Sequence, residues 1–185
     1  MNRTKTFWIT QTAALIALLI VCQALTASFG NVVLTGSIVN CILVIASVTG
    51  GLTSGLTVAA LSPFFASLLG IGPALALWPI LICAAIGNSV LVSCWHFVVL
   101  WGKRTQKKPL LAFGIATAAA ALAKFATLYT GVVVIALPLM HLAEKQTAAL
   151  SASFGISQLF TAAIGGAVAS LALPALLKAV KRTGA

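Results

Sequence analysis

The placement of the charged side chains is the feature that most constrains the fold of this chain. Nine of its eleven Lys and Arg residues lie in three short clusters, near residues 3–5, 103–108 and 178–182, whereas Asp and Glu together contribute one residue. The segments between the clusters are apolar, with 61% hydrophobic residues overall and a mean hydropathy of +1.15. So few charges cannot cover the surface of a soluble fold, and we therefore predict an integral membrane protein.

The net charge of +10 does not indicate nucleic-acid binding. A nucleic-acid interface needs basic residues spread over one face, among hydrogen-bonding and aromatic neighbours. The basic residues here flank apolar runs, as the positive-inside rule predicts for segments that stay in the cytoplasm. We expect the chain to contact the lipid bilayer and no nucleic acid.

Turn-forming residues and charges divide the chain into six apolar segments, each a candidate for the roughly 20-residue helix that spans a bilayer. The expected helices cover about 7–28, 35–48, 52–69, 74–100, 110–137 and 147–180. The second is too short to cross the hydrocarbon layer unaided, so either its ends extend further or neighbouring helices shield it. The predicted fold class is an all-α integral membrane protein, with one six-helix domain over residues 1–185.

The orientation follows from the number of spans. With six helices, both termini and the loop between the fourth and fifth helices share one side, and placing that side in the cytoplasm keeps all three basic clusters inside. The run from Trp8 to about Ala27 follows a basic pair, as in a secretory signal, but no persuasive cleavage site follows it and it is long enough to span. We expect a retained first helix and cytoplasmic N- and C-termini.

Lys124 is the sharpest functional candidate, because a lysine near the centre of a membrane helix costs about 2.5 to 3.5 kcal/mol. The only acidic residue, Glu144, falls in the predicted loop 138–146, so no intramembrane carboxylate can neutralise it. The alternatives are snorkelling to the interface, or satisfaction by amides and helix dipoles. Since Lys124 lies about 21 Å along its helix from Leu110 at 1.5 Å per residue, we favour binding of a polar or anionic substrate that supplies the countercharge.

Other polar residues fall at similar depths in the expected helices, namely Gln23, Asn40, Asn88, Tyr129 and Gln158. Each alone is typical of an interhelical hydrogen bond, worth about 0.6 kcal/mol. Together they predict one polar pocket that faces outward from the midplane. Trp78, at the outer end of the fourth helix, either covers this pocket or anchors the helix at the interface. The predicted substrate-binding residues are Lys124, Asn88, Tyr129, Gln158, Asn40 and Trp78.

The sequence offers no recognisable catalytic or metal site. It lacks a Walker lysine loop, an HExxH motif, paired carboxylates and a nucleophile–base–acid set. All four cysteines lie in apolar runs without CxxC spacing, which favours small buried side chains over metal ligands or disulfides. With its one acidic residue outside the helices, the chain also has too few carboxylates for an ordinary proton relay or Na⁺ cage. We expect a protein that is not an enzyme and needs no metal or cofactor.

Residues 34–92 carry the most distinctive pattern. A TGxxVN sequence enters the second helix, a Gly-rich turn follows, a Ser-Pro pair lies inside the third helix, and a Pro…Gly-Asn run follows along the fourth. This pattern resembles the substrate-binding S components of energy-coupling factor transporters, small six-helix proteins that capture vitamins and other micronutrients in prokaryotes. The close match covers about a third of the chain, and the remainder agrees in topology and length.

The resemblance implies a site and partners. Substrates of the family bind in the outer half, between the outer loops and the fourth to sixth helices, and a coupling subunit with two ATPase subunits supplies the energy. An AxxxA motif on the first helix docks onto the coupling subunit, and Ala13 and Ala17 have that spacing. The resemblance does not name the substrate, although Lys124 favours one with a carboxylate or phosphate. The alternatives are a stand-alone secondary transporter or facilitator, and a membrane scaffold in which the polar residues only join helices.

Overall fold

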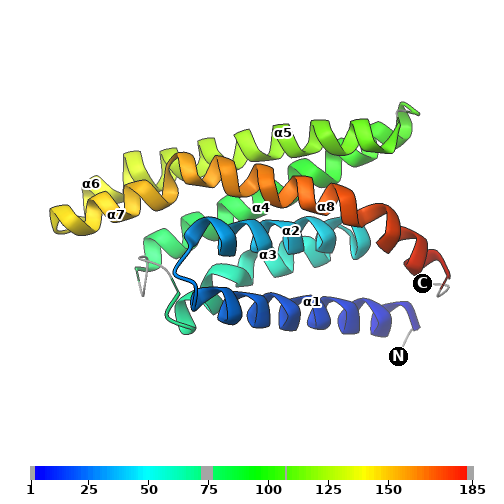
Figure 1. Ribbon diagram of the computed structural model, residues 1–185, viewed down its shortest axis with the longest axis horizontal. Coiled ribbons are helices and arrows are strands. Elements are labelled where there is room, and N and C mark those ends of the chain that lie inside the picture. The colour runs from blue at the N-terminus through cyan, green and yellow to red at the C-terminus, as the bar shows by residue number, and fades with distance from the viewer. Residues whose placement is uncertain (1–2, 72–76, 107, 183–185) are drawn as a thin grey trace.

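The computed structural model describes residues 3–71, 77–106 and 108–182, and these are mostly helical with no strand among them. Figure 1 shows the helices running roughly parallel or antiparallel along one long axis. In chain order they are α1 (Arg3–Ala27), α2 (Val32–Thr49), α3 (Gly51–Leu68), α4 (Trp78–Arg104), α5 (Pro109–Leu128), the π-helical segment η1 (Tyr129–Ala136), α6 (Leu137–Met140), α7 (Glu144–Phe154) and α8 (Ile156–Arg182).

Among the described residues, six helical stretches are long and apolar enough to cross a membrane, which agrees with the predicted number of apolar helices. They are Thr6–Ala27, Val32–Thr49, Gly51–Leu68, Trp78–Arg104, Pro109–Met140 and Glu144–Ala179. The fifth joins α5, η1 and α6 into one rod, and the sixth joins α7 and α8. The expected start of the fourth helix, at residues 74–76, lies outside the described residues.

Most helix boundaries shift by a few residues from the prediction, and the two differences that change the architecture lie in the last third of the chain. Glu144 was expected in a loop, but it is the first residue of α7, so the predicted loop 138–146 is shorter than expected. The last span is also interrupted at Gly155, where φ is −85° and ψ is −135°. A Cβ at Gly155 would lie 2.7 Å from the backbone oxygen of Ser151, so this break requires glycine. The sequence prediction had one continuous helix over about 147–180, so this break was not expected.

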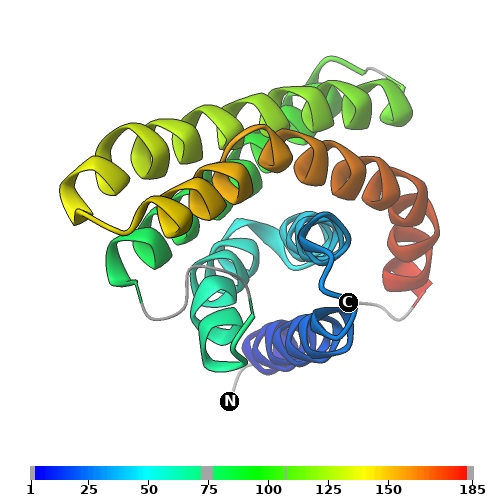
Figure 2. The ribbon, with the colours of Figure 1, turned by 60° about the vertical axis from the view of Figure 1, so that its left-hand side comes forward.

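Helix α2 occupies the middle of the bundle, which explains how a short helix is accommodated. It packs against α1, α3, α4 and α8, and Figure 2 shows it nearly end-on with the other helices around it. Its 18 residues measure about 27 Å at 1.5 Å per residue. Asn31 begins the helix, because its side chain accepts hydrogen bonds from the backbone N–H groups of Val33 (3.0 Å) and Leu34 (3.1 Å). Both expected explanations for the short second helix therefore hold, since it extends at its start and is shielded.

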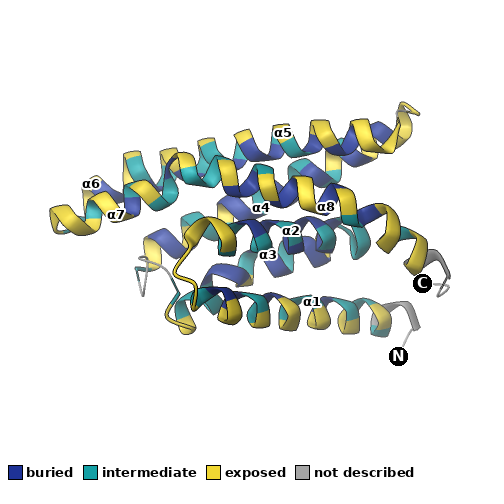
Figure 3. Cartoon of the chain, in the orientation of Figure 1, coloured by how far each residue is buried: buried dark blue, intermediate teal, exposed yellow. Residues whose placement is uncertain are grey.

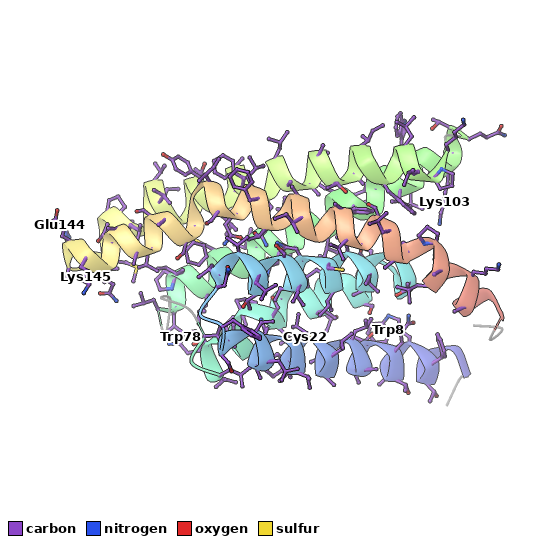
Figure 4. All side chains as sticks on the ribbon, viewed as in Figure 1. Trp8, Cys22, Trp78, Lys103, Glu144 and Lys145 are labelled. Atoms are coloured by element: carbon purple, nitrogen blue, oxygen red, sulfur yellow. The ribbon has the colours of Figure 1, made fainter. Side chains whose placement is uncertain are left out.

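The three regions that carry the basic clusters lie at one end of the molecule. The start of α1, the end of α8, the end of α4 and the start of α5 all lie at the right of Figure 1, and Figure 4 places Lys103 at that same end. Glu144 and Lys145 lie at the opposite end. This arrangement is the one expected of six spans with a single basic side.

Buried apolar side chains form two separate cores. The main core joins α1 to α5 and α8, with Leu43, Val58 and Trp95 among its largest fully buried members. A smaller core joins α4, α5, η1, α6 and α7, and consists of Ile80, Leu128, Val132, Leu137 and Leu150. The outward faces of the helices are exposed along their length in Figure 3, and many of their side chains are large and apolar, as a lipid-facing surface requires.

Glycine lets α8 approach α2 closely, and this contact gives a first prediction. A Cβ at Gly165 would lie 2.5 Å from the backbone oxygen of Ser37 and 2.7 Å from the Cβ of Asn40. We expect Gly165→Ala to lower the free energy of unfolding by about 1 to 3 kcal/mol, the usual cost of overpacking. Thermal unfolding in detergent measures the change. Gly114→Ala is the matched control, because a Cβ there meets nothing within 4 Å, and equal melting temperatures for the two variants would contradict the prediction.

Candidate ligand-binding site

Lys124 lies inside the helix bundle and does not snorkel. Its side chain is 4% exposed, and its Nζ donates hydrogen bonds to Oδ1 of Asn40 at 2.6 Å and to Oδ1 of Asn88 at 2.7 Å. Hydrogen bonds of this length are typical of a charged donor. An ammonium group has three N–H donors, and the third finds no acceptor among the described residues.

The two asparagines extend these bonds into a network. Nδ2 of Asn88 donates to Oγ of Ser62 at 2.8 Å, and Nδ2 of Asn40 donates to Oγ1 of Thr161 at 3.3 Å. Nε2 of Gln23 donates to the backbone oxygen of Ser62 at 3.3 Å. Each of the six spans therefore contributes one side chain to what we call the Lys124 network: Gln23 (α1), Asn40 (α2), Ser62 (α3), Asn88 (α4), Lys124 (α5) and Thr161 (α8).

The Ser-Pro pair in α3 explains how Ser62 enters the network. Pro63 has no N–H, so the backbone oxygen of Ala59 loses its usual partner four residues on. Oγ of Ser62 donates to that oxygen at 3.3 Å, and its lone pairs remain free to accept from Asn88. A helix-interior Ser-Pro pair was thus the sequence signal for this site residue, although it entered our prediction only through the family resemblance.

Close helix packing brings the asparagines to Lys124. Gly165 of α8 faces the Cβ of Asn40, where an added Cβ would lie within 2.7 Å. Gly87 allows α4 to approach α5 equally closely, because a Cβ there would lie 2.6 Å from Cγ of Leu128. Asn88 is the next residue along α4, so the close approach of α4 and α5 at Gly87 occurs beside the hydrogen bond between Lys124 and Asn88. Small residues at such positions allow membrane helices to approach closely enough for side-chain hydrogen bonds.

A cavity of about 320 Å³ lies beside the network. Gln23, Ser62, Asn88 and Lys124 provide its polar floor. Its apolar walls come mainly from Val39, Pro63, Leu81, Leu128 and Phe154. The remaining lining residues include the α1–α2 connection, the end of α3 and the α7–α8 junction. These all lie toward the end of the molecule opposite the start of α1 and the end of α8.

Four of the predicted site residues belong to this site. Lys124, Asn88 and Gln158 line the cavity. Asn40 is 1% exposed and accepts a hydrogen bond from Lys124, but it is not one of the residues that line the cavity. Gln158 reaches back across the α7–α8 break, where its Nε2 donates to the backbone oxygen of Ser153 at 2.9 Å.

The other two predicted residues do not line the cavity. Tyr129 is 45% exposed and packs against Phe125, with ring centroids 5.7 Å apart. Being five residues beyond Lys124, it is more than one helical turn away and points to another side of the helix. Trp78 is 65% exposed and packs against Phe64, with ring centroids 6.1 Å apart. Trp78 lies at the first residue of α4, and its role as an interfacial anchor stays a prediction.

Three network residues were absent from the predicted site. Gln23 was recognised as a polar residue at similar depth, but the sequence did not show that it faces Ser62. Thr161 lies three residues after Gln158 and therefore on the same face of α8. This spacing is the sequence signal that could have identified Thr161 as a site residue. The hydroxyl residues were missed because Ser and Thr are common in membrane helices, where they usually bond to their own backbone.

The polar groups of the site are of few chemical kinds. The network consists of neutral amides and hydroxyls around one cationic side chain, and Glu144 is exposed at the start of α7. Within the described ranges, no group of three or more His, Cys, Asp or Glu residues could hold a metal ion.

No protein-family model matches the chain, and no significant match is found among curated proteins or solved structures.

Proposed function

We propose that this chain is the substrate-binding S component of an energy-coupling factor transporter in the cell membrane of a prokaryote. It captures a vitamin-like micronutrient in the cavity, and a membrane-embedded coupling subunit with two ATPase subunits drives uptake. The observation that carries the proposal is the 320 Å³ cavity with a polar floor beside a hydrogen-bond network from six spans. Small-molecule sites are typically concave and mostly apolar, with a few convergent polar groups.

The charge distribution supports the direction of capture. The positive-inside rule favours a cytoplasmic location for the end of the molecule that carries the basic clusters. The lining residues at helix ends then belong to the outer side, and a solute entering from outside meets Lys124 near the middle of the bundle. This orientation is what uptake of an external nutrient requires.

Native mass spectrometry of the gently purified protein tests the proposal. We expect one small molecule to co-purify at near-stoichiometric occupancy and to leave on mild activation. Absence of any such molecule, together with no thermal stabilisation by any member of a vitamin panel, would favour the scaffold alternative. Transport that persists in vesicles without the ATPase subunits would instead favour a stand-alone transporter.

The exposed face of α1 gives a second prediction, which concerns assembly with the coupling subunit. Ala13 and Ala17 are both exposed on α1, so this face is accessible to a partner helix. We expect Ala13→Trp or Ala17→Trp to reduce recovery of the assembled complex at least about tenfold, because bulk at a small-residue contact keeps helices apart. Substrate binding should be unchanged. Pull-down of the coupling subunit measures assembly.

Leu18→Trp is the matched control for this prediction. Leu18 is 49% exposed on α1, but it lies about 100° around the helix from Ala17. Tryptophan at this position should leave assembly intact. Normal assembly in both alanine variants, or equal loss in all three, would count against a docking role for this face.

A further inference from the structure

We infer that the ligand of this cavity is a small organic anion, which binds Lys124 through an acidic oxygen and Gln23 through a neighbouring N–H or O–H group. This inference deepens the proposed function and rests on it, since it assumes that the cavity binds a solute. It is carried by two unsatisfied groups of the Lys124 network: the third N–H of Lys124 and the side-chain oxygen of Gln23.

Charge is the first part of the argument. Both described partners of Nζ are neutral amide oxygens, which satisfy two N–H groups and leave the formal charge without a counterion. A buried ion without a countercharge is costly. The chain contains one acidic side chain, Glu144, and it is exposed at the start of α7. A ligand in the adjacent cavity is therefore the most direct source of negative charge.

Geometry is the second part. The amides of α2 and α4 take two of the three N–H groups of Lys124, and the side chain itself lines the cavity. The remaining N–H is thus available to an acidic oxygen that enters the cavity. The two short bonds also hold Nζ in place before the ligand arrives, so little side-chain entropy is lost on binding.

Gln23 supplies the second recognition element. It is 3% exposed, it lines the cavity, and its Nε2 is held by the backbone oxygen of Ser62 at 3.3 Å. Its Oε1 is buried and has no hydrogen-bond partner in the described part of the chain. A buried acceptor without a donor costs free energy, which a ligand donor would recover. Gln23 and Lys124 are joined through Ser62 and Asn88, so both recognition elements belong to one polar floor.

The size and walls of the cavity restrict the rest of the ligand. Its 320 Å³ lies at the lower end of the range of about 300 to 1,000 Å³ for small-molecule sites. Leu81, Leu128, Val39 and Phe154 provide apolar surface above the polar floor. The ligand class is therefore a compact metabolite with an apolar body, an acidic group and an adjacent hydrogen-bond donor.

Capture from a mixture tests this inference even though the ligand is unidentified. The purified protein is equilibrated with a small-metabolite extract of a bacterial culture, freed of unbound solute and analysed by native mass spectrometry. We expect the captured species to be organic anions that carry an N–H or O–H donor. The methyl ester of the captured acid should bind the wild-type protein about 100-fold more weakly, because it loses a charge-assisted hydrogen bond.

Variants separate the two recognition elements. We expect Lys124→Met to weaken binding of the captured anion about 100-fold, whereas Lys124→Arg, which keeps the charge, stays within about tenfold of wild type. Gln23→Met should weaken it about tenfold, because a neutral hydrogen bond is worth less than a charged one. The ester comparison uses the unaltered protein, so it remains decisive if Lys124→Met does not fold.

The outcomes distinguish this inference from the proposed function. Capture of a neutral or cationic metabolite, or equal binding of acid and ester, overturns the inference and leaves a solute-binding role intact. Equal affinity of wild type and Lys124→Met for the captured anion also overturns it. If the wild-type protein captures nothing, the proposed function and the inference both fail.

Discussion

Asn88→Asp is expected to weaken anion binding strongly while the protein remains folded. Oδ1 of Asn88 lies 2.7 Å from Nζ of Lys124, so an aspartate of the same shape places a carboxylate directly against the ammonium group. This internal countercharge competes with the ligand for the same cation. We expect a loss of affinity of about 100-fold, or about 2.7 kcal/mol, for the captured anion. Isothermal titration in detergent measures the affinity, and thermal unfolding verifies the fold.

Asn40→Asp is the control that separates charge from contact. Oδ1 of Asn40 lies 2.6 Å from the same Nζ, but Asn40 does not line the cavity, so its replacement leaves the ligand's surroundings unchanged. If the missing countercharge is what the ligand supplies, both aspartate variants lose affinity to a similar degree. Loss in Asn88→Asp alone would mean that Asn88 contacts the ligand, and the charge argument would then be wrong.

Asn40→Leu is expected to have the largest effect on stability, a loss of about 2 to 4 kcal/mol. The substitution removes one of two described acceptors of Lys124 and the donor to Oγ1 of Thr161. Asn40 is 1% exposed and lies away from the cavity lining, so water in the cavity cannot replace its oxygen. Asn88→Leu should cost less, because Asn88 does line the cavity. Reversible unfolding in detergent measures each loss.

A double variant tests whether the loss of stability in Asn40→Leu comes from the Lys124 ammonium group that has lost its acceptor. Adding Lys124→Met removes the cation that lost its acceptor, and we expect most of the stability to return. Asn31→Ala provides a reference, since loss of the exposed cap of α2 costs typically about 1 kcal/mol. If Asn40→Leu costs no more than this cap, or the double variant is less stable than Asn40→Leu, the network does not carry the stability assigned to it.

The membrane architecture was largely predictable from the sequence. The number of spans follows from apolar length, because a bilayer imposes nearly the same requirement on every helix. The short second helix was also recognisable, and its central position in the bundle explains it. The break at Gly155 was not predicted, because a change of backbone conformation at one residue leaves no clear mark in the average hydropathy of a span.

The site was predictable only in part. Depth along a helix can be counted, and this singled out Lys124, Asn88, Asn40 and Gln158. The direction in which a side chain points depends on helix rotation, which depth does not determine. Tyr129 was therefore grouped with Lys124 although it faces another side.

The sequence by itself determined that this chain needs a bilayer, how many times it can cross, and that one lysine lies inside without a carboxylate at its depth. These properties depend on composition and order, since transfer of apolar and charged groups into lipid is a property of each residue. The tertiary structure decided which neutral groups hold Lys124, and that a cavity opens beside it. Those contacts join residues as far apart in sequence as Asn40 and Thr161. They exist only because close helix packing brings their side chains within hydrogen-bonding distance.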